Sequence, residues 1–319
     1  MKKHLLILGI IGLCAVALIT SCKKENATLD PKVEQFNTDA NNYKSEVDQA
    51  DNDINNALGD IPAFKNGGEM PEILSSPLCG VTIDSSQIAQ KILFFNFDGV
   101  TSCFSPSRLR SGQIKVQLTS GTHWSDPGAV LTETFINFKI TRQSDNKSIM
   151  FNGVKTLKNI NGNDWIAFLL STKSLKYQER AFNIAVTFDN NLNATWNSAR
   201  TTEWNYVKAN VNPGIQYAHI TFTAKGDTTI NGFNSADTWG VNRYGYGFTT
   251  YYNSPLLSNT YCGLWRFTSG ELVHHVNNED FMLTLGVDVD GNPTPSTCAY
   301  GFKVTWTSSG KTNSVILSY

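Results

Sequence analysis

The sequence has no long run of basic residues. Lys and Arg together number 26 and Asp and Glu number 27 among 319 residues, and the charged residues within the first 21 positions are Lys2 and Lys3. A chain that begins after residue 21 therefore has 24 basic and 27 acidic side chains, a formal charge of −3. Nucleic acids and anionic lipid surfaces are bound through dense positive charge. The composition therefore argues against a nucleic acid as partner.

Residue groups that hold metals or form catalytic sites are also scarce. The cysteines lack the close Cys-x-x-Cys spacing of structural zinc sites. His123 and His219 have no Ser or Cys in a recognisable nucleophile setting, so we find no catalytic triad. His274 and His275 are neighbours in an extended segment, so their side chains point to opposite faces and do not easily reach one ion. We therefore expect a non-catalytic protein and no cofactor.

The segment Asp288-x-Asp290-x-Asn292 allows two interpretations. Its three oxygen-bearing side chains have the spacing of a calcium loop, and Gly291 permits a sharp turn. However, the twelfth position of such a loop falls on Ala299 rather than on Glu, and Asp-Gly between apolar runs is first a hairpin signal. We expect a turn, with a metal site as the alternative.

A glycosidase needs two carboxylates held close together. Within the β-rich region only Asp288 and Asp290 are carboxylates two residues apart, and they lie in a predicted turn, so little supports a glycosidase.

The N-terminus predicts export and lipid anchoring. A charged start is followed by a mostly apolar stretch over residues 5–19 and then by Thr20-Ser21-Cys22, which has the layout of a signal peptide. The apolar stretch is shorter than the roughly 20 residues that cross a bilayer. Ile19-Thr20-Ser21-Cys22 resembles the bacterial lipobox, which implies cleavage before an acylated Cys22. An ordinary secretory signal with an incidental cysteine is the alternative.

Lys23 follows the cysteine where an inner-membrane retention signal would have Asp. The lipobox predicts palmitate-type acylation of Cys22, and Lys23 predicts an outer-membrane location, on either the periplasmic or the cell-surface face. In such an oxidising compartment the four remaining cysteines favour disulfides. Three connectivities are open, and a zinc site is the rival. We prefer the two pairs that are close in sequence and similar in context, Cys79 with Cys103 and Cys262 with Cys298.

An amphipathic helix is predicted over residues 31–58. Asp30-Pro31 supplies an N-cap and a proline at the first helical position, and Gly59 and Pro62 end the pattern. Apolar residues recur between these limits at spacings of three and four. We interpret residues 22–30 as a tether, 31–58 as a helical spacer docked on the body, and 59–76 as a hinge. A self-associating coiled coil is the alternative.

From residue 77 onward the pattern is all-β. β-branched and aromatic residues alternate with polar ones, and Gly, Asn and Asp interrupt them about every ten residues. Cys79-Gly80, a strand, Asp98-Gly99 and Cys103 are echoed by Cys262-Gly263, a strand, Asp290-Gly291 and Cys298. We therefore predict an antiparallel β-sandwich-like body in two related halves, residues 77–176 and 177–319, preceded by the helix.

Several segments also carry a resemblance to a known family. They are Ser21-Cys22-Lys23, the acidic and Asn-rich helix, Cys79-Gly80-Val81-Thr82-Ile83-Asp84, Phe95-Asn96-Phe97-Asp98-Gly99, Cys103, Arg108-Leu109-Arg110-Ser111-Gly112-Gln113-Ile114-Lys115-Val116, Phe151-Asn152-Gly153-Val154-Lys155-Thr156 and the segment 262–311. On these segments the chain resembles the uncharacterised β-rich lipoproteins of the Bacteroidota. The resemblance implies an envelope location and a β-rich fold, and it implies no activity.

Aromatic residues supply the candidate contact surface. Over residues 244–252, interpreted as one strand, Tyr244, Tyr246 and Phe248 share a face, and Trp265 adds a ring nearby. Such rings stack on sugars or partner chains, and the alternative is that they fill the core. Asp227-Thr228-Thr229 resembles an O-glycosylation acceptor at Thr228. We expect a lipoprotein that contacts the membrane through its lipid and binds a glycan or protein ligand. A purely structural envelope protein and an extracytoplasmic hydrolase are the alternatives.

Overall fold

The computed structural model describes residues 31–65, 78–103, 107–163, 168, 173–207, 219–263, 266–294, 298–308 and 310–319. The predicted signal peptide, the lipidation site Cys22 and the tether lie outside these residues, as does the candidate ligand residue Trp265. Within the described part of the chain, no helix combines the length and apolarity needed to cross a bilayer.

A single long helix opens the described chain. α1 runs from Pro31 to Asp60, within two residues of the span that the sequence predicts. It begins with proline, whose missing N–H is not needed in the first turn. A short 3-10 helix, η2 (Ile88–Gln90), follows β1.

The body is built from antiparallel strands. Their bounds are β1 Val81–Asp84, β2 Ile92–Asp98, β3 Arg108–Ser120, β4 Val130–Arg142, β5 Ser148–Asn159, β6 Leu175–Phe188, β7 Asn193–Val207, β8 His219–Gly226, β9 Thr228–Ile230, β10 Phe233–Val241, β11 Gly247–Asn259, β12 Phe267–Val276, β13 Glu279–Val287, β14 Gly301–Ser308 and β15 Lys311–Ser318. All pair into one sheet in the order β1-β2-β3-β4-β5-β6-β7-β10-β11-β12-β13-β14-β15, with β8 pairing β7 and β11, and β9 pairing β10.

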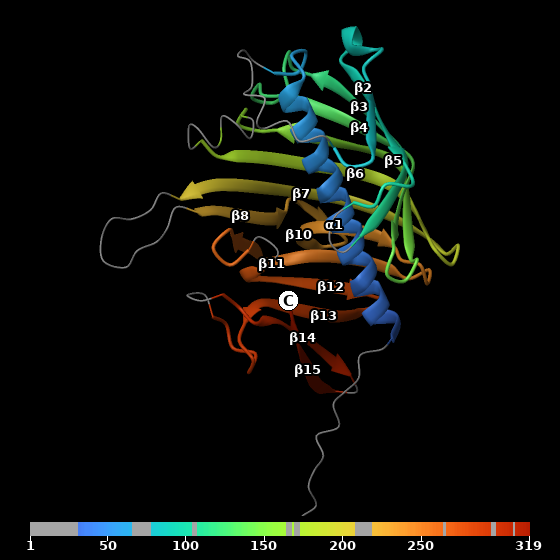
Figure 1. Ribbon diagram of the computed structural model, residues 1–319. Helices are drawn as coiled ribbons and strands as arrows, with labels where there is room; N and C mark the ends of the chain where they lie inside the picture. Colours follow the sequence, from blue (N-terminus) through green and yellow to red (C-terminus); the bar gives the residue numbers. More distant parts are fainter. Residues whose placement is uncertain are drawn as a thin grey trace, which may run out of the picture.

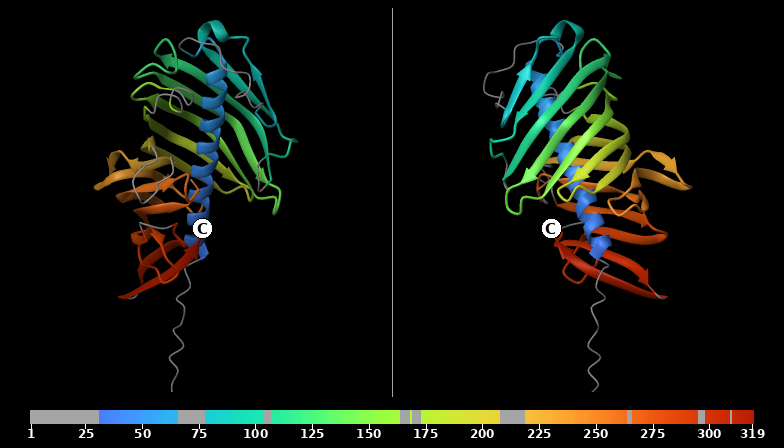
Figure 2. Two further views of the ribbon diagram at one scale, coloured as in Figure 1. Left: turned by 60° about the vertical axis from the view of Figure 1, so that its left-hand side comes forward. Right: turned by 90° about the vertical axis from the view of Figure 1, so that its right-hand side faces the viewer.

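The predicted all-β class with one N-terminal helix is confirmed, but the layers differ from a sandwich. The strands form one continuous sheet rather than two stacked sheets. The sheet curves, and α1 lies across its concave face (Figure 1), as two further views also show (Figure 2). A one-sheet protein must cover one apolar face. The helix provides that cover, so no second sheet is required. The sequence predicts two β halves that meet between residues 176 and 177. This boundary falls inside β6, which pairs with both β5 and β7, so the sheet continues across it.

Aligned β-bulges contribute to the curvature. Register shifts occur at neighbouring positions of β3, β4, β5 and β6, where the backbone of one residue in each strand has a positive φ. These residues are Gly112, Asn137, Gly153 and Asn183. A bulge bends its strand and increases the local twist. At Gly112 a Cβ would lie 2.1 Å from the carbonyl oxygen of Asn137, so the close approach of β3 and β4 requires glycine there.

The helix belongs to the core rather than acting as a separate spacer. Phe36, Tyr43 and Ile54 are buried in the main hydrophobic cluster together with side chains from the concave sheet face. The Tyr43 and Trp196 rings are 4.6 Å apart, and those of Phe36 and Phe248 are 4.9 Å apart. The predicted docking of the apolar stripe is therefore confirmed, and its extent makes α1 one of the two layers of the fold.

Two disulfides join the cysteines that the sequence pairs. Cys79 bonds to Cys103 and Cys262 to Cys298. Cys79 precedes β1 and Cys103 follows β2, whereas Cys262 follows β11 and Cys298 precedes β14, so the two bonds lie towards opposite ends of the sheet order. The preferred connectivity is confirmed, and these cysteines are not zinc ligands.

Candidate ligand-binding groove beside the helix

Acidic residues of α1 face basic residues of the sheet. Five helix carboxylates each pair with a cation from β3, β5, β7 or the β10–β11 turn: Asp39 with Arg243, Glu46 with Arg108, Asp48 with Arg200, Asp51 with Lys155, and Asp53 with Arg110. Charges that leave water need such partners. Because the cations come from separate strands, the pairs fix both the direction and the register of the helix on the sheet.

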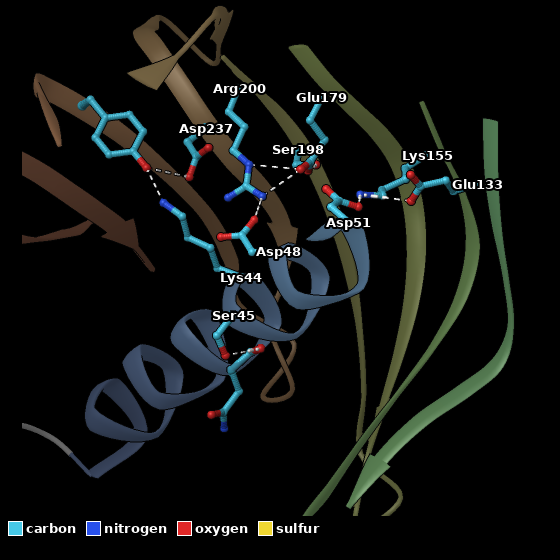
Figure 3. Close-up of polar contacts among 12 residues, drawn as sticks. Lys44, Ser45, Asp48, Asp51, Glu133, Lys155, Glu179, Ser198, Arg200 and Asp237 are labelled. Atoms are coloured by element: carbon cyan, nitrogen blue, oxygen red, sulfur yellow. Dashed lines mark hydrogen bonds and ion pairs between the residues drawn. The ribbon is translucent and has the colours of Figure 1, made fainter. Parts of the chain in front are cut away.

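The most deeply buried cation is Lys155 of β5. Its ammonium contacts the carboxylate of Asp51 and lies 3.2 Å from that of Glu133 on β4 (Figure 3). Burial alone would lower the pKa of Lys155, but the two carboxylates outweigh it and raise that pKa. Burial raises the pKa of Asp51 well above its usual range, against the charge of Lys155. Lys155 is therefore a buried cation held between carboxylates of the helix and of β4.

A second buried group centres on Arg200 of β7. Its guanidinium lies 2.8 Å from Glu179 of β6 and also contacts Asp48, while the Ser198 hydroxyl donates to Glu179 (Figure 3). Burial would raise the pKa of Glu179, but the charges of Arg200 and Lys155 and these hydrogen bonds lower it to about 2. Glu179 is therefore a permanent anion at neutral pH.

Lys44 connects this polar layer to the distal strands. Its ammonium donates to the Tyr252 hydroxyl at 2.8 Å, and that hydroxyl donates to Asp237 at 3.1 Å. Burial raises the pKa values of Tyr252 and Asp237. The aliphatic stem of Lys44 spans from α1 to β11 and separates two cavities on the concave side.

The larger cavity is a groove of about 560 Å³ between α1 and the concave sheet face. Its helix wall is polar and is formed by Asn41, Lys44, Ser45, Asp48, Gln49, Asp51, Asn52 and Asn55. Its sheet wall holds Leu157, Glu179, Arg200, Thr202 and the aromatic residues Tyr177, Trp204, Phe222 and Phe267. We define these residues as the groove. The helix wall is therefore polar, and the sheet wall combines aromatic rings with the Glu179–Arg200 ion pair.

The aromatic wall is formed by neighbouring strands. Trp204 of β7 and Phe222 of β8 are register partners, and their ring centroids are 4.4 Å apart. Both rings are half-buried, as is Phe267 of β12. Rings that keep an exposed surface inside a concave site are available for stacking on a ligand. The groove thus contains a set of half-buried rings on its sheet side.

A second cavity continues the groove towards β12 and β13. It has a volume of about 210 Å³ and shares Asn41, Lys44 and Phe267 with the groove. Its remaining lining is largely apolar and includes Leu272 and Leu283. A ligand in the groove therefore has an adjoining apolar extension beyond Lys44.

The acidic residues of the groove do not favour a metal ion. Carboxylate oxygens of Asp48, Asp51 and Glu179 all lie within 4.8 Å of one another. However, Lys155 and Arg200 already contact these oxygens. Two fixed cations at the same positions oppose the entry of a third.

The segment Asp288 to Asn292 forms the expected turn. The carboxylate of Asp288 accepts hydrogen bonds from the backbone N–H groups of Asp290 and Asn292, at 2.9 Å and 2.8 Å. Gly291 has a φ of +82°, which glycine adopts at low cost. The turn lies away from the residues that line the groove. Calcium binding by these residues stays a prediction.

The predicted aromatic row on one strand face does not form. Tyr244 and Tyr246 lie in the turn between β10 and β11, where Asn242 accepts hydrogen bonds from both backbone N–H groups. Both rings are half-buried and lie beside the ammonium of Lys32 in the first turn of α1. Phe248 is 4% exposed and packs against α1. The Asn242 turn interrupts the strand pattern before β11, and all three residues contact the helix. Ligand binding by these residues stays a prediction.

The remaining predicted positions are accounted for as follows. Thr228 is half-buried at the start of β9, and its glycosylation stays a prediction. His274 is buried against Thr250, whereas His275 contacts Asp280, so the two rings point to opposite faces as expected.

Sequence reasoning missed the groove because its aromatic residues come from four strands, β6, β7, β8 and β12, and most of its polar residues come from the helix. The spacing of Asn41, Ser45, Gln49 and Asn52 at three and four residues is the one signal that predicts a shared polar helix face. No family model, curated protein or solved structure matches the chain. The basis for assigning a function is therefore the geometry of the groove.

Proposed function

We propose that the chain is a lipid-anchored envelope lipoprotein that binds a saccharide, without catalysis, in the groove between α1 and the concave sheet face. One observation carries the proposal: half-buried rings of Trp204, Phe222 and Phe267 face a polar helix wall across a space of about 560 Å³. The predicted acylation of Cys22 places this groove at the outer membrane.

The two walls match the two surfaces of a sugar ring. A sugar presents C–H groups on one face and hydroxyls around its edge. Aromatic rings suit the former, and side-chain amides and hydroxyls suit the latter because each carries both donor and acceptor atoms. Asn41, Ser45 and Gln49 provide such groups opposite Trp204 and Phe222. The partial exposure of these rings supports binding over a purely structural role.

A glycoside hydrolase is the second candidate, and one observation favours it. Burial raises the pKa of Asp51 and the surrounding cations lower that of Glu179, so the pKa values of the two carboxyls shift in opposite directions although their oxygens lie within 4.8 Å of each other. Such a difference assigns an acid and a base or nucleophile. Their ion pairs with Lys155 and Arg200 favour a structural role for both groups, which is why binding is preferred.

The groove is tested by screening residues 23–319 against immobilised oligosaccharides and host matrix proteins. Titration calorimetry then compares the wild type with Trp204→Ala, and with Tyr261→Ala as an exposed aromatic control outside the groove. We expect Trp204→Ala to weaken saccharide binding about tenfold, or about 1.4 kcal/mol, and the control to have no effect. Absence of any saccharide ligand contradicts the proposal, and release of shorter saccharides establishes the hydrolase instead.

The membrane anchor is tested separately. Metabolic labelling with an alkyne fatty acid should mark the wild-type chain and should not mark Cys22→Ser. An unlabelled wild-type chain that remains in the cytosol contradicts the location, whatever the groove binds.

A further inference from the structure

A second hollow lies on the convex face of the sheet, opposite the helix. Register pairing places Asn197 of β7, Trp239 of β10, Thr249 of β11 and His275 of β12 side by side across four strands. Phe248, the neighbour of Thr249, packs against α1 on the concave side. Because successive strand residues point to opposite faces, the row that contains Thr249 faces outward. The hollow around this row has a volume of about 690 Å³.

The lining of this hollow is uncharged and rich in amides. Among the described residues that line it there is no Asp, Glu, Lys or Arg, and the one titratable side chain is that of His275, which contacts Asp280 at 2.7 Å. Five asparagines line it: Asn183, Asn197, Asn231, Asn277 and Asn278. The Asn197 carboxamide accepts from the backbone N–H of Asn183 and donates to the carbonyl oxygen of Trp239, and Asn231 donates to the Thr249 hydroxyl. The carboxamides of Asn183, Asn277 and Asn278 carry donors and an acceptor without charge. The groove beside α1, by contrast, has ion pairs on its floor.

Four of these asparagines occupy left-handed backbone conformations. Asn183 forms a bulge in β6, Asn231 belongs to the β9–β10 turn, and Asn277 and Asn278 form the β12–β13 turn, with φ between 50° and 63°. Asparagine is tolerated in such turns, and glycine would adopt them more easily. Turn chemistry accounts for each position singly. Turn chemistry does not explain why three separate segments meet at one hollow and why each of them has asparagine there, where glycine would adopt the backbone more easily.

Aromatic rings complete the hollow. The ring of Phe182 is 59% exposed and meets the Trp239 ring edge to face, with centroids 6.1 Å apart. On the opposite side Phe233 stacks on Tyr251 with centroids 4.7 Å apart. Trp239 and Phe233 both line the space. Large apolar side chains that remain exposed beside hydrogen-bonding groups are typical of contact surfaces.

We propose that this convex hollow is a second binding site, for a neutral saccharide. Its amides fit hydroxyl groups, its rings fit the C–H faces of sugars, and its lack of cations gives no counter-charge for sulfated or uronic saccharides. The proposal does not depend on the groove, since the two sites lie on opposite faces of the sheet and share no lining residue.

The test uses the mature full chain in detergent on an array of neutral malto-, cello-, laminari- and manno-oligosaccharides with sulfated and uronic counterparts. We expect binding of a neutral saccharide that Trp239→Ala or Phe182→Ala weakens at least tenfold. Asn278→Asp puts a charge into the hollow while keeping a residue that tolerates the turn, and it should weaken binding about fivefold. Asn191→Asp is the matched control because Asn191 is exposed and left-handed outside the hollow.

Thermal unfolding of each variant checks the fold, and the exposed Phe182 and Asn278 decide the outcome if Trp239→Ala does not fold. The proposal is overturned if the chain binds no neutral saccharide, if only acidic saccharides bind, or if Phe182→Ala and Asn278→Asp bind as the wild type does. Trp204→Ala separates the sites. If Trp204→Ala alone abolishes all binding, the groove stands and the hollow fails, and the reverse pattern removes the groove and retains the hollow.

Discussion

At the scale of single residues, Lys155 makes the clearest energetic prediction. Its side chain is 1% exposed between Asp51 and Glu133. Removing the charge in Lys155→Met leaves two buried carboxyls without their cation, which costs about 3 to 5 kcal/mol of unfolding free energy. Urea unfolding at pH 7 measures the loss. Arg142→Met is the control, because the Arg142–Asp145 pair is exposed and should contribute less than about 1 kcal/mol. Equal losses in the two variants would contradict the buried network.

His274 predicts a pH dependence. Burial, together with the charge of Lys44, lowers its pKa to about 3. The folded state therefore resists a proton that the unfolded chain binds near pH 6.5. The contribution of neutral His274 to the free energy of unfolding is intact above pH 6.5 and is lost as the pH falls towards 3. Between pH 6.5 and 4.5 the wild type should lose about 2 kcal/mol more unfolding free energy than His274→Gln. Parallel pH profiles for the two proteins would show that the ring does not titrate in this way.

At the scale of elements, α1 should behave as core. Phe36→Ala and Ile54→Ala each remove a side chain that is 1% exposed, and each should lower the unfolding free energy by about 3 kcal/mol. Glu34→Ala, on the exposed side of the same helix, should change it by less than about 0.5 kcal/mol. Chemical denaturation measures all three variants. A helical spacer that merely touches the sheet would tolerate the two core substitutions.

The disulfide near the C-terminal end of the sheet order gives a second element-scale prediction. Cys262 and Cys298 close a segment with a sequence separation of 36 residues. Replacing both with Ser should lower the unfolding free energy by about 2 to 5 kcal/mol. Thermal unfolding under non-reducing conditions provides the comparison. If the wild type and the double variant still differ in stability when both are fully reduced, loss of this bond does not explain the effect.

The sequence allowed some elements to be predicted and hid others. Asp30-Pro31 and the apolar spacing located α1, and cysteine spacing located both disulfides. The apolar–polar alternation is weak in β7, because its concave side carries Ser198 and Arg200, which are buried as partners of Glu179. A strand whose buried face is partly polar breaks the alternation on which such predictions depend. Local pattern cannot indicate that a charge is buried when its partner comes from a distant helix.

At the scale of the whole molecule, the fold class was predictable and the layer arrangement was not. Alternation of apolar and polar residues indicates strands, but it does not say whether they form one sheet or two. That choice depends on aligned bulges, on α1 as a covering layer, and on ion pairs between the helix and four separate parts of the sheet. The groove exists only once all of these are assembled. Its residues come from six elements, so no single segment of sequence predicts it.

Hydrogen exchange with mass spectrometry tests saccharide binding in the groove most directly. Residues 23–319 are compared with and without the oligosaccharide that binds most tightly on an array. We predict slower exchange in α1 around residues 41–52 and in β7 and β8 near Trp204 and Phe222, and loss of this protection in Trp204→Ala. If a bound saccharide leaves exchange in these segments unchanged, the groove is not its binding site.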